Sequence, residues 1–218
     1  MLTSSQLSKK LKGKLVLSDV SFSVGGGEVV GIVGPNGSGK TTLLNILTGF
    51  LKPDNGAFKL TTRRIGFAIS RKGMFGDMSV LDNLKISAKL LYGNHCNLST
   101  AMDRFGIDYG SELFSSLSAG MQQRVSLVLP FAEKNDLLFL DEPTNHLDID
   151  NIFVLKNAIL AARADGSGCI VTSHVVSYLE KICDRIIFLK DGRIVQDVLT
   201  DVLLKKYGSL EDAYLDVN

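Results

Sequence analysis

The clearest chemistry in the sequence belongs to a glycine-rich loop between an apolar run and a helical pattern. Residues 34–41 (GPNGSGKT) satisfy the spacing of a phosphate-binding loop. Gly37 and Gly39 allow backbone angles that point successive N–H groups inward, and the following helix presents its positive dipole end. Lys40 can bind the β- and γ-phosphates, while the Thr41 hydroxyl is a hard oxygen ligand for Mg²⁺. A turn that merely caps a helix is the alternative. The candidate phosphate-binding residues are Gly34, Pro35, Asn36, Gly37, Ser38, Gly39, Lys40, Thr41 and Thr42.

Two carboxylates follow a second apolar run. Residues 137–140 (LLFL) predict a buried strand that ends in Asp141 and Glu142. Because ligands of open α/β sheets bind at the carboxyl ends of strands, we expect both side chains at that edge. Asp141 is placed to hold Mg²⁺ directly or through water. Glu142 is a candidate general base, or water-orienting group, for attack on a γ-phosphate. Helix capping is the alternative for such acidic residues.

Strand and helix patterns alternate around these two sites. Apolar or β-branched runs predict strands at residues 15–17, 20–24, 28–33, 137–140, 168–172 and 186–189. Leucines at helical spacing follow the loop, and residues 79–134 are mostly helical in pattern. Residues 190–193 predict a hairpin turn into a short last strand. This order indicates an α/β domain with a largely parallel sheet, into which a helical block is inserted.

Composition and charge exclude several other classes of protein. The 218 residues are 45% hydrophobic and 22% charged, which is ordinary for a folded chain. Their 24 basic and 23 acidic residues leave a net charge of +1, so no large basic surface for nucleic acid is expected. The three cysteines form no CxxC pair, which favours free thiols in a reducing cytoplasm. Residues 1–13 lack the apolar block of a signal peptide, and no segment approaches the roughly 20 apolar residues that span a bilayer.

Residues 117–125 (LSAGMQQRV) resemble the signature motif of ABC transporter nucleotide-binding domains, and the resemblance covers nearly the whole chain. It implies one domain over residues 1–218 with a P-loop NTPase fold: a RecA-like core, an N-terminal antiparallel β subdomain, and an α-helical subdomain inserted at about 76–134. Ser118 is expected to cap a helix, so that Ser118, Ala119 and Gly120 offer donors at its positive end. By analogy, these donors meet the γ-phosphate bound on the opposite protomer.

Two further motifs extend the resemblance. Residues 144–148 (TNHLD) resemble the family's D-loop, which places Asp148 at the contact between subunits. Residues 172–174 (TSH) resemble its switch motif, which implies that His174 contacts the γ-phosphate. The resemblance thus implies an ATPase that uses ATP and Mg²⁺, with Lys40, Glu142 and His174 as its catalytic residues.

The resemblance also implies partners. A dimer of nucleotide-binding domains, identical or different, is expected on the cytoplasmic face of a membrane, bound to a separate polytopic permease and not to nucleic acid. Residues 77–84 (DMSVLDNL) resemble the family segment that contacts the permease. The tail at 209–215 (SLEDAYL) resembles that of exporter ATPases, which favours export over import.

Three positions depart from the family pattern. The Q-loop glutamine, which ties Mg²⁺ and water to the permease contact, falls at Ser70, whose hydroxyl is a possible metal ligand with shorter reach. No aromatic residue precedes Phe22 where the family usually stacks adenine, so Leu11 or Val16 would contact the base instead. Pro130 should interrupt the signature helix and kink it toward its end.

Two other functions fit parts of the sequence. The D-loop form at 144–148 is frequent in soluble family members that act on ribosomes, although those usually carry two such domains in one chain. The departures at Ser70 and Leu11 would suit a degenerate, non-hydrolysing ATP-binding regulatory module. ATP hydrolysis by the purified protein would distinguish a transport ATPase from that module. Co-purification with a polytopic membrane protein would distinguish a transport ATPase from a soluble ATPase acting on ribosomes or DNA.

The missing aromatic residue predicts weak discrimination between purine bases. Most binding free energy should come from the phosphate loop and Mg²⁺, which read no base. Apolar contact with Leu11 or Val16 cannot distinguish adenine from guanine, and tenfold discrimination needs about 1.4 kcal/mol. We therefore expect GTP to bind and to be hydrolysed within about tenfold of ATP. Competition titration measures this, and a preference for ATP of about a hundredfold would contradict it.

Overall fold

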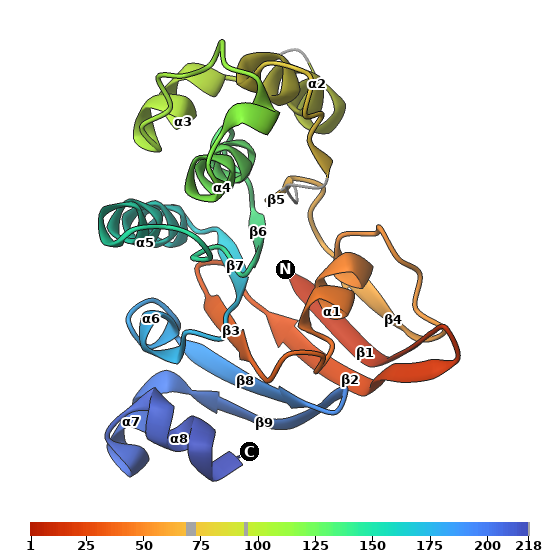
Figure 1. Ribbon diagram of the computed structural model, residues 1–218. Coiled ribbons are helices and arrows are strands. Elements are labelled where there is room, and N and C mark those ends of the chain that lie inside the picture. Colours follow the sequence, from red (N-terminus) through yellow and green to blue (C-terminus); the bar gives the residue numbers. More distant parts are fainter. Residues whose placement is uncertain (69–72, 94–95, 218) are drawn as a thin grey trace.

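The computed structural model describes residues 1–68, 73–93 and 96–217, and its core is a six-stranded sheet (Figure 1). In spatial order the strands are β5 (Ile65–Phe67), β6 (Leu137–Asp141), β7 (Gly168–Thr172), β3 (Val29–Val33), β8 (Arg185–Lys190) and β9 (Arg193–Leu199). The first five run parallel, and β9 pairs with β8 antiparallel through the expected hairpin. The predicted α/β domain with a largely parallel sheet is confirmed.

A smaller antiparallel sheet confirms the N-terminal β subdomain. Its order is β2 (Lys14–Val24), β1 (Leu2–Leu11) and β4 (Asn55–Leu60). The strands predicted at 15–17 and 20–24 are one strand, β2. Asp19, with a φ of 56°, lies where the register against β1 shifts, so a bulge separates the two apolar runs without ending the strand.

Strand β1 was not predicted, because its sequence is rich in serine and lysine. Leu2, Ser4 and Leu7 are buried, while half of the strand is exposed. The register also shifts between Ser4 and Leu7, around Gln6 with its φ of 51°. An extra residue at this bulge breaks the two-residue alternation by which a half-buried strand is recognised.

Helix α1 (Lys40–Leu47) lies between the two sheets (Figure 1). Val30 and Ile32 of β3 pack into the same apolar cluster as the leucines of α1. Val29 and Val33 point to the opposite face, where they share a second cluster with residues of α5 (Ile149–Ala164) and α6 (Val176–Glu180). The central strand is therefore covered on both faces, as its almost wholly apolar sequence predicts.

The helices α2 (Val80–Tyr92), α3 (Leu98–Arg104) and α4 (Ala119–Val128) form a separate group at the top of Figure 1, and α7 (Thr200–Tyr207) and α8 (Leu210–Val217) follow β9. The signature helix α4 ends at Val128 and continues as a 3₁₀ turn, η3 (Leu129–Phe131), which contains Pro130. Proline thus interrupts the α-helix where predicted. Of the helices described, none has the length and apolar character needed to cross a bilayer. All three cysteines are free.

The turn between β8 and β9 packs against β2 and against the phosphate loop. Gly192 N–H donates to Ser38 O over 3.1 Å, and Ser18 N–H donates to Gly192 O over 2.8 Å. A Cβ at Gly192, where φ is 75°, would lie 2.2 Å from Val16 O. The turn therefore joins β2 to the loop and leaves no room for a side chain.

Replacing Gly192 by alanine should destabilise the fold more than the same change at Gly13. Gly13 ends the β1–β2 turn with a φ of 80°, and a Cβ there meets no heavy atom within 4 Å. Gly13→Ala should cost about 1–2 kcal/mol for the positive φ. Gly192→Ala should cost roughly 1–3 kcal/mol more, because the Val16 backbone must move. Urea denaturation measures both, and equal losses would show that the turn is not tightly packed.

Candidate functional site

Three neighbouring parallel strands bring the predicted site residues to one edge of the sheet. Thr172, at the end of β7, pairs with Ile32 of β3 on one side and with Asp141 of β6 on the other. The phosphate loop, the acidic pair and the switch motif leave these strands at the same level. The acidic pair thus becomes a neighbour of the phosphate loop, about 100 residues before it, and of the switch motif, about 30 residues after it. This is the arrangement predicted for the carboxyl edge of the sheet.

The phosphate loop is held in place by close packing at its two ends. A Cβ at Gly34 would lie 2.1 Å from Leu189 O, and one at Gly39 would lie 2.7 Å from Leu17 Cδ2. Between them Gly37 has a φ of 84° and open space around it. Pro35 and Asn36 are exposed with Gly37, so the loop presents backbone to solvent above the start of α1. A phosphate fits such a surface, because backbone N–H groups and the helix dipole both favour an anion.

Lys40 is buried inside this loop. Its Nζ donates to Gly34 O over 2.7 Å and to Pro35 O over 3.3 Å. The same Nζ lies 3.7 Å from Glu142 Oε1. The ammonium is thus held at the loop's centre by two carbonyls, with a carboxylate as its counter-charge. Ser38, beside it, has a buried hydroxyl without a hydrogen-bond partner among the described residues, and Thr42 is half-buried.

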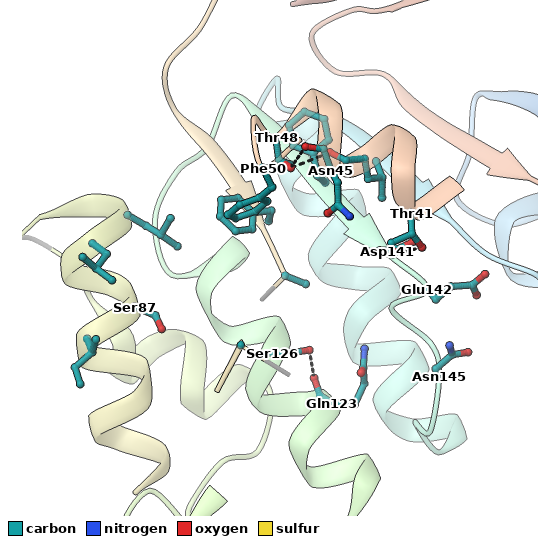
Figure 2. Close-up of a pocket in the computed structure, with 18 of the residues that line it drawn as sticks. Thr41, Asn45, Thr48, Phe50, Ser87, Gln123, Ser126, Asp141, Glu142 and Asn145 are labelled. Carbon is teal, nitrogen blue, oxygen red and sulfur yellow. Dashed lines mark hydrogen bonds between the residues drawn. The ribbon is translucent and has the colours of Figure 1, made fainter. Parts of the chain in front are cut away.

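Two candidate oxygen ligands for a metal, Thr41 and Asp141, meet beside the loop. Thr41 Oγ1 donates to Asp141 Oδ2 over 2.7 Å, and the two side chains point at one another in Figure 2. Mg²⁺ in nucleotide sites is bound by one or two such groups, with waters and phosphates completing its shell. A hydroxyl and a carboxylate in contact fit that chemistry. The third predicted ligand, Ser70, lies outside the described residues.

The Glu142 carboxylate links Lys40 to His174. Glu142 Oε2 lies 2.7 Å from His174 Nδ1 and accepts a hydrogen bond from His174 N–H over 3.2 Å. Glu142 itself has a φ of 45°, a left-handed conformation that is rare for a residue with a side chain. The three residues expected to be catalytic therefore form one chain of contacts, built around a strained residue.

Ser118 and Ala119 of the signature motif and Asp148 of the D-loop lie on the surface, at the starts of two helices. Ser118 caps α4 by accepting Met121 N–H over 3.3 Å, and Ala119 is exposed. Asp148 caps α5 by accepting Asn151 N–H over 2.8 Å, which lowers the pKa of its carboxyl. Within the described ranges, no hydrogen bond or ion pair joins these caps to the phosphate loop. Their place at exposed helix starts leaves them open to a second molecule.

A close contact connects these two motifs. A Cβ at Gly120 would lie 2.7 Å from His146 O, so the start of α4 rests directly on the D-loop backbone. Gln123, buried in α4, donates from Nε2 to Pro143 O over 3.1 Å. His146 has a φ of 64° and an exposed side chain. It contributes its carbonyl here, and the sequence assigned it no catalytic role.

Of the two residues expected to face a base, Val16 contacts the phosphate loop. The carbonyl of Val16, in β2, would lie 2.9 Å from a Cβ at Gly39. Leu11 is exposed at the end of β1 and pairs with Lys14 across the hairpin. Val16 is therefore the better placed of the two for an apolar contact beside the phosphates.

One residue with direct contacts to the site received no role from the sequence. Thr172 Oγ1 donates to Asp141 Oδ1 over 2.5 Å and accepts Glu142 N–H over 2.9 Å. In the sequence, the signal for such a role is a hydroxyl side chain at the end of an apolar strand. Its partners became apparent only with the order and register of β6 and β7.

A cavity of about 920 Å³ opens from the candidate metal ligands toward the helical group (Figure 2). Thr41, Asp141 and Glu142 line one end. Exposed apolar side chains line much of the rest: Phe50 after α1, Phe75, and Ile86 and Leu90 of α2. This apolar lining differs from the polar phosphate site that it adjoins.

Comparison with known proteins gives consistent matches. The family model described as ABC transporter matches residues 17–145. An uncharacterized ABC transporter ATP-binding protein of Methanocaldococcus jannaschii is 31% identical over 215 residues, which cover 96% of this chain and 81% of that protein. A phosphate import ATP-binding protein of Natronomonas pharaonis is 35% identical over 213 residues, covering 84% and 75%.

Two further matches concern transport and fold. A lantibiotic transport ATP-binding protein of Streptococcus pyogenes is 28% identical over 204 residues, which cover 89% of each chain. A solved structure described as the ATP binding subunit of an ABC transporter superposes with a TM-score of 0.89. It is 25% identical and covers 100% of this chain and 99% of its own. Sequence and fold agree.

Proposed function

This chain belongs to the ABC transporter family, and we propose that it is the ATP-hydrolysing subunit that drives a separate membrane permease. The contact chain from Lys40 through Glu142 to His174 carries the proposal, because it joins a phosphate-binding cation, a carboxylate and an imidazole beside the Thr41–Asp141 pair. A module that only binds ATP has no need of a base held in a strained conformation. This observation favours hydrolysis over the regulatory alternative.

Each group of site residues has a separate role in the proposed reaction. Backbone N–H groups of the loop and Lys40 hold the β- and γ-phosphates, so that the γ-phosphorus faces Glu142. Glu142 accepts the proton of the attacking water, and His174 orients the Glu142 carboxylate and contacts the γ-phosphate. Bound Mg²⁺, held by Thr41 and Asp141, would neutralise charge on the phosphates.

A dimer completes the site in this proposal. Ser118, Ala119 and Gly120 stand at an exposed helix start, where N–H groups and a hydroxyl offer donors to an anion. On one subunit these donors would meet the γ-phosphate bound by the other, with Asp148 at the contact between them. Two nucleotides would then form part of the dimer interface.

The apolar cavity supports the permease as partner. Its exposed side chains Phe50, Phe75, Ile86 and Leu90 surround a hollow beside the segment at 77–84. An apolar hollow of this kind fits the apolar face of a short helix supplied by another chain. The subunit would then lie on the cytoplasmic face of the membrane. The proposal that transport is export rests only on the tail at 209–215, since the names of the relatives include both phosphate import and lantibiotic transport.

Glu142→Gln should bind ATP and hardly hydrolyse it, because the amide cannot take the proton of the water. We expect kcat to fall by about 100-fold or more. The variant should also accumulate as an ATP-bound dimer, which light scattering with saturating MgATP would detect. A variant that hydrolyses ATP at the wild-type rate would remove Glu142 from the mechanism, and a persistent monomer would contradict the shared interface.

Lys40→Ala tests nucleotide binding, whereas Glu142→Gln tests turnover. Loss of the ammonium leaves the phosphate charge without its main cation in the protein, so tight MgATP binding should disappear. Near-normal affinity in Lys40→Ala would disprove the assignment of the phosphate loop, whatever Glu142→Gln does.

Leu90→Glu should weaken binding of the permease and leave ATP hydrolysis by the isolated subunit unchanged. The Leu90 side chain is 81% exposed and lines the cavity, so a charge there would face the apolar partner. Leu215→Glu is the control, because Leu215 is 74% exposed on α8 and does not line the cavity. Co-purification with a polytopic membrane protein is the measurement. Equal retention by both variants would exclude the cavity as the contact.

A further inference from the structure

Thr172 lies at the centre of the three strands that supply the site, and its side chain is fully buried. It ends β7, pairs with Ile32 and Asp141 on the two neighbouring strands, and is 0% exposed. Nucleotide cannot reach a side chain in this position. Any effect that Thr172 has on chemistry must pass through the residues that it contacts.

The hydrogen bonds of Thr172 leave its hydroxyl with one orientation. A threonine hydroxyl has a single proton to donate and two lone pairs to accept with. Its proton goes to Asp141 Oδ1, over 2.5 Å, because an ionised carboxylate can only accept. A lone pair of the same oxygen accepts Glu142 N–H over 2.9 Å. One hydroxyl therefore joins the proposed metal ligand to the proposed base.

Both contacts fix groups that would otherwise be free to turn. Asp141 Oδ2 accepts from Thr41, so the two hydroxyls together determine the plane of the carboxylate. At Glu142 the N–H is shared between the carbonyl and the hydroxyl of Thr172, over 3.2 and 2.9 Å. With a φ of 45°, Glu142 needs such support to keep its left-handed backbone.

We propose that Thr172 is a positioning residue whose hydroxyl orients Asp141 toward the metal and holds the Glu142 backbone in its strained conformation. This inference rests on the proposed function, since it assigns Asp141 and Glu142 the roles given there. Hydrogen-bonded partners of metal-binding carboxylates orient them and tune the metal in this way. Removal of the hydroxyl should therefore alter metal use and turnover without altering phosphate binding by the loop.

The decisive variants are Thr172→Val, which keeps the shape and removes the hydroxyl, and Thr172→Ser, which keeps the hydroxyl. Thr200→Val is the matched control. Thr200 is 4% exposed, and its hydroxyl has no hydrogen-bond partner among the described residues. Thermal unfolding reports whether each variant folds, and Thr172→Ser tests the proposal even if valine is not tolerated.

Two measurements separate positioning from packing. The first is the affinity for the fluorescent analogue TNP-ATP with and without MgCl₂, and the second is the dependence of ATP hydrolysis on MgCl₂. For Thr172→Val we expect unchanged metal-free affinity, a kcat about 10- to 100-fold lower, and a similar rise in the MgCl₂ concentration for half-maximal rate. Thr172→Ser and Thr200→Val should remain near wild type in all three quantities.

The outcomes distinguish this inference from the function on which it rests. A folded Thr172→Val protein with wild-type turnover and Mg²⁺ dependence would overturn the inference and leave the ATPase assignment intact. Loss of metal-free TNP-ATP affinity, or failure of Thr172→Ser to restore Mg²⁺ dependence, would also overturn it, because either shows a structural defect. A wild-type protein without turnover would contradict the proposed function, while the effect of MgCl₂ on TNP-ATP affinity would still decide whether Thr172 positions Asp141.

Discussion

The register of β3, β7 and β6 is the constraint on which the rest of the site depends. Because Thr172 pairs with both Ile32 and Asp141, the three strands end at the same level. A slip by one residue would turn the Asp141 side chain to the other face of the sheet, away from Thr41. Burial enforces this register: alternate residues of β6 enter the cluster around α1 and the cluster around α5 and α6. Apolar packing thus sets the geometry of the polar site.

Much of the core could be predicted from sequence because its signals are local. Each buried parallel strand is a short apolar run, and the phosphate loop carries its chemistry in eight consecutive residues, 34–41. The antiparallel sheet was harder to predict. Strand β1 is mostly polar, and its bulge at Gln6 and that of β2 at Asp19 break the alternation that marks a half-buried strand. Their pairing depends on partners in another segment, which no local pattern records.

The same distinction holds within the candidate site. The sequence singles out Lys40, Asp141 and Glu142 by type and spacing. It does not reveal that Glu142 has a positive φ or that it contacts Lys40 and His174, since both follow from tertiary packing. Thr172 was overlooked because its contacts lie 31 and 30 residues away in sequence. Residues that act through others are apparent only when the strand order is known.

The close approach of Gly120 to His146 affects how the proposed dimer would assemble. A Cβ at Gly120 would lie 2.7 Å from the His146 carbonyl, so the signature helix packs directly against the D-loop backbone. Gln123 of the same helix donates to Pro143 O, in the residue that precedes the D-loop. A subunit would thus present both motifs to its partner as one continuous surface. The two motifs would then engage the partner together and leave it together.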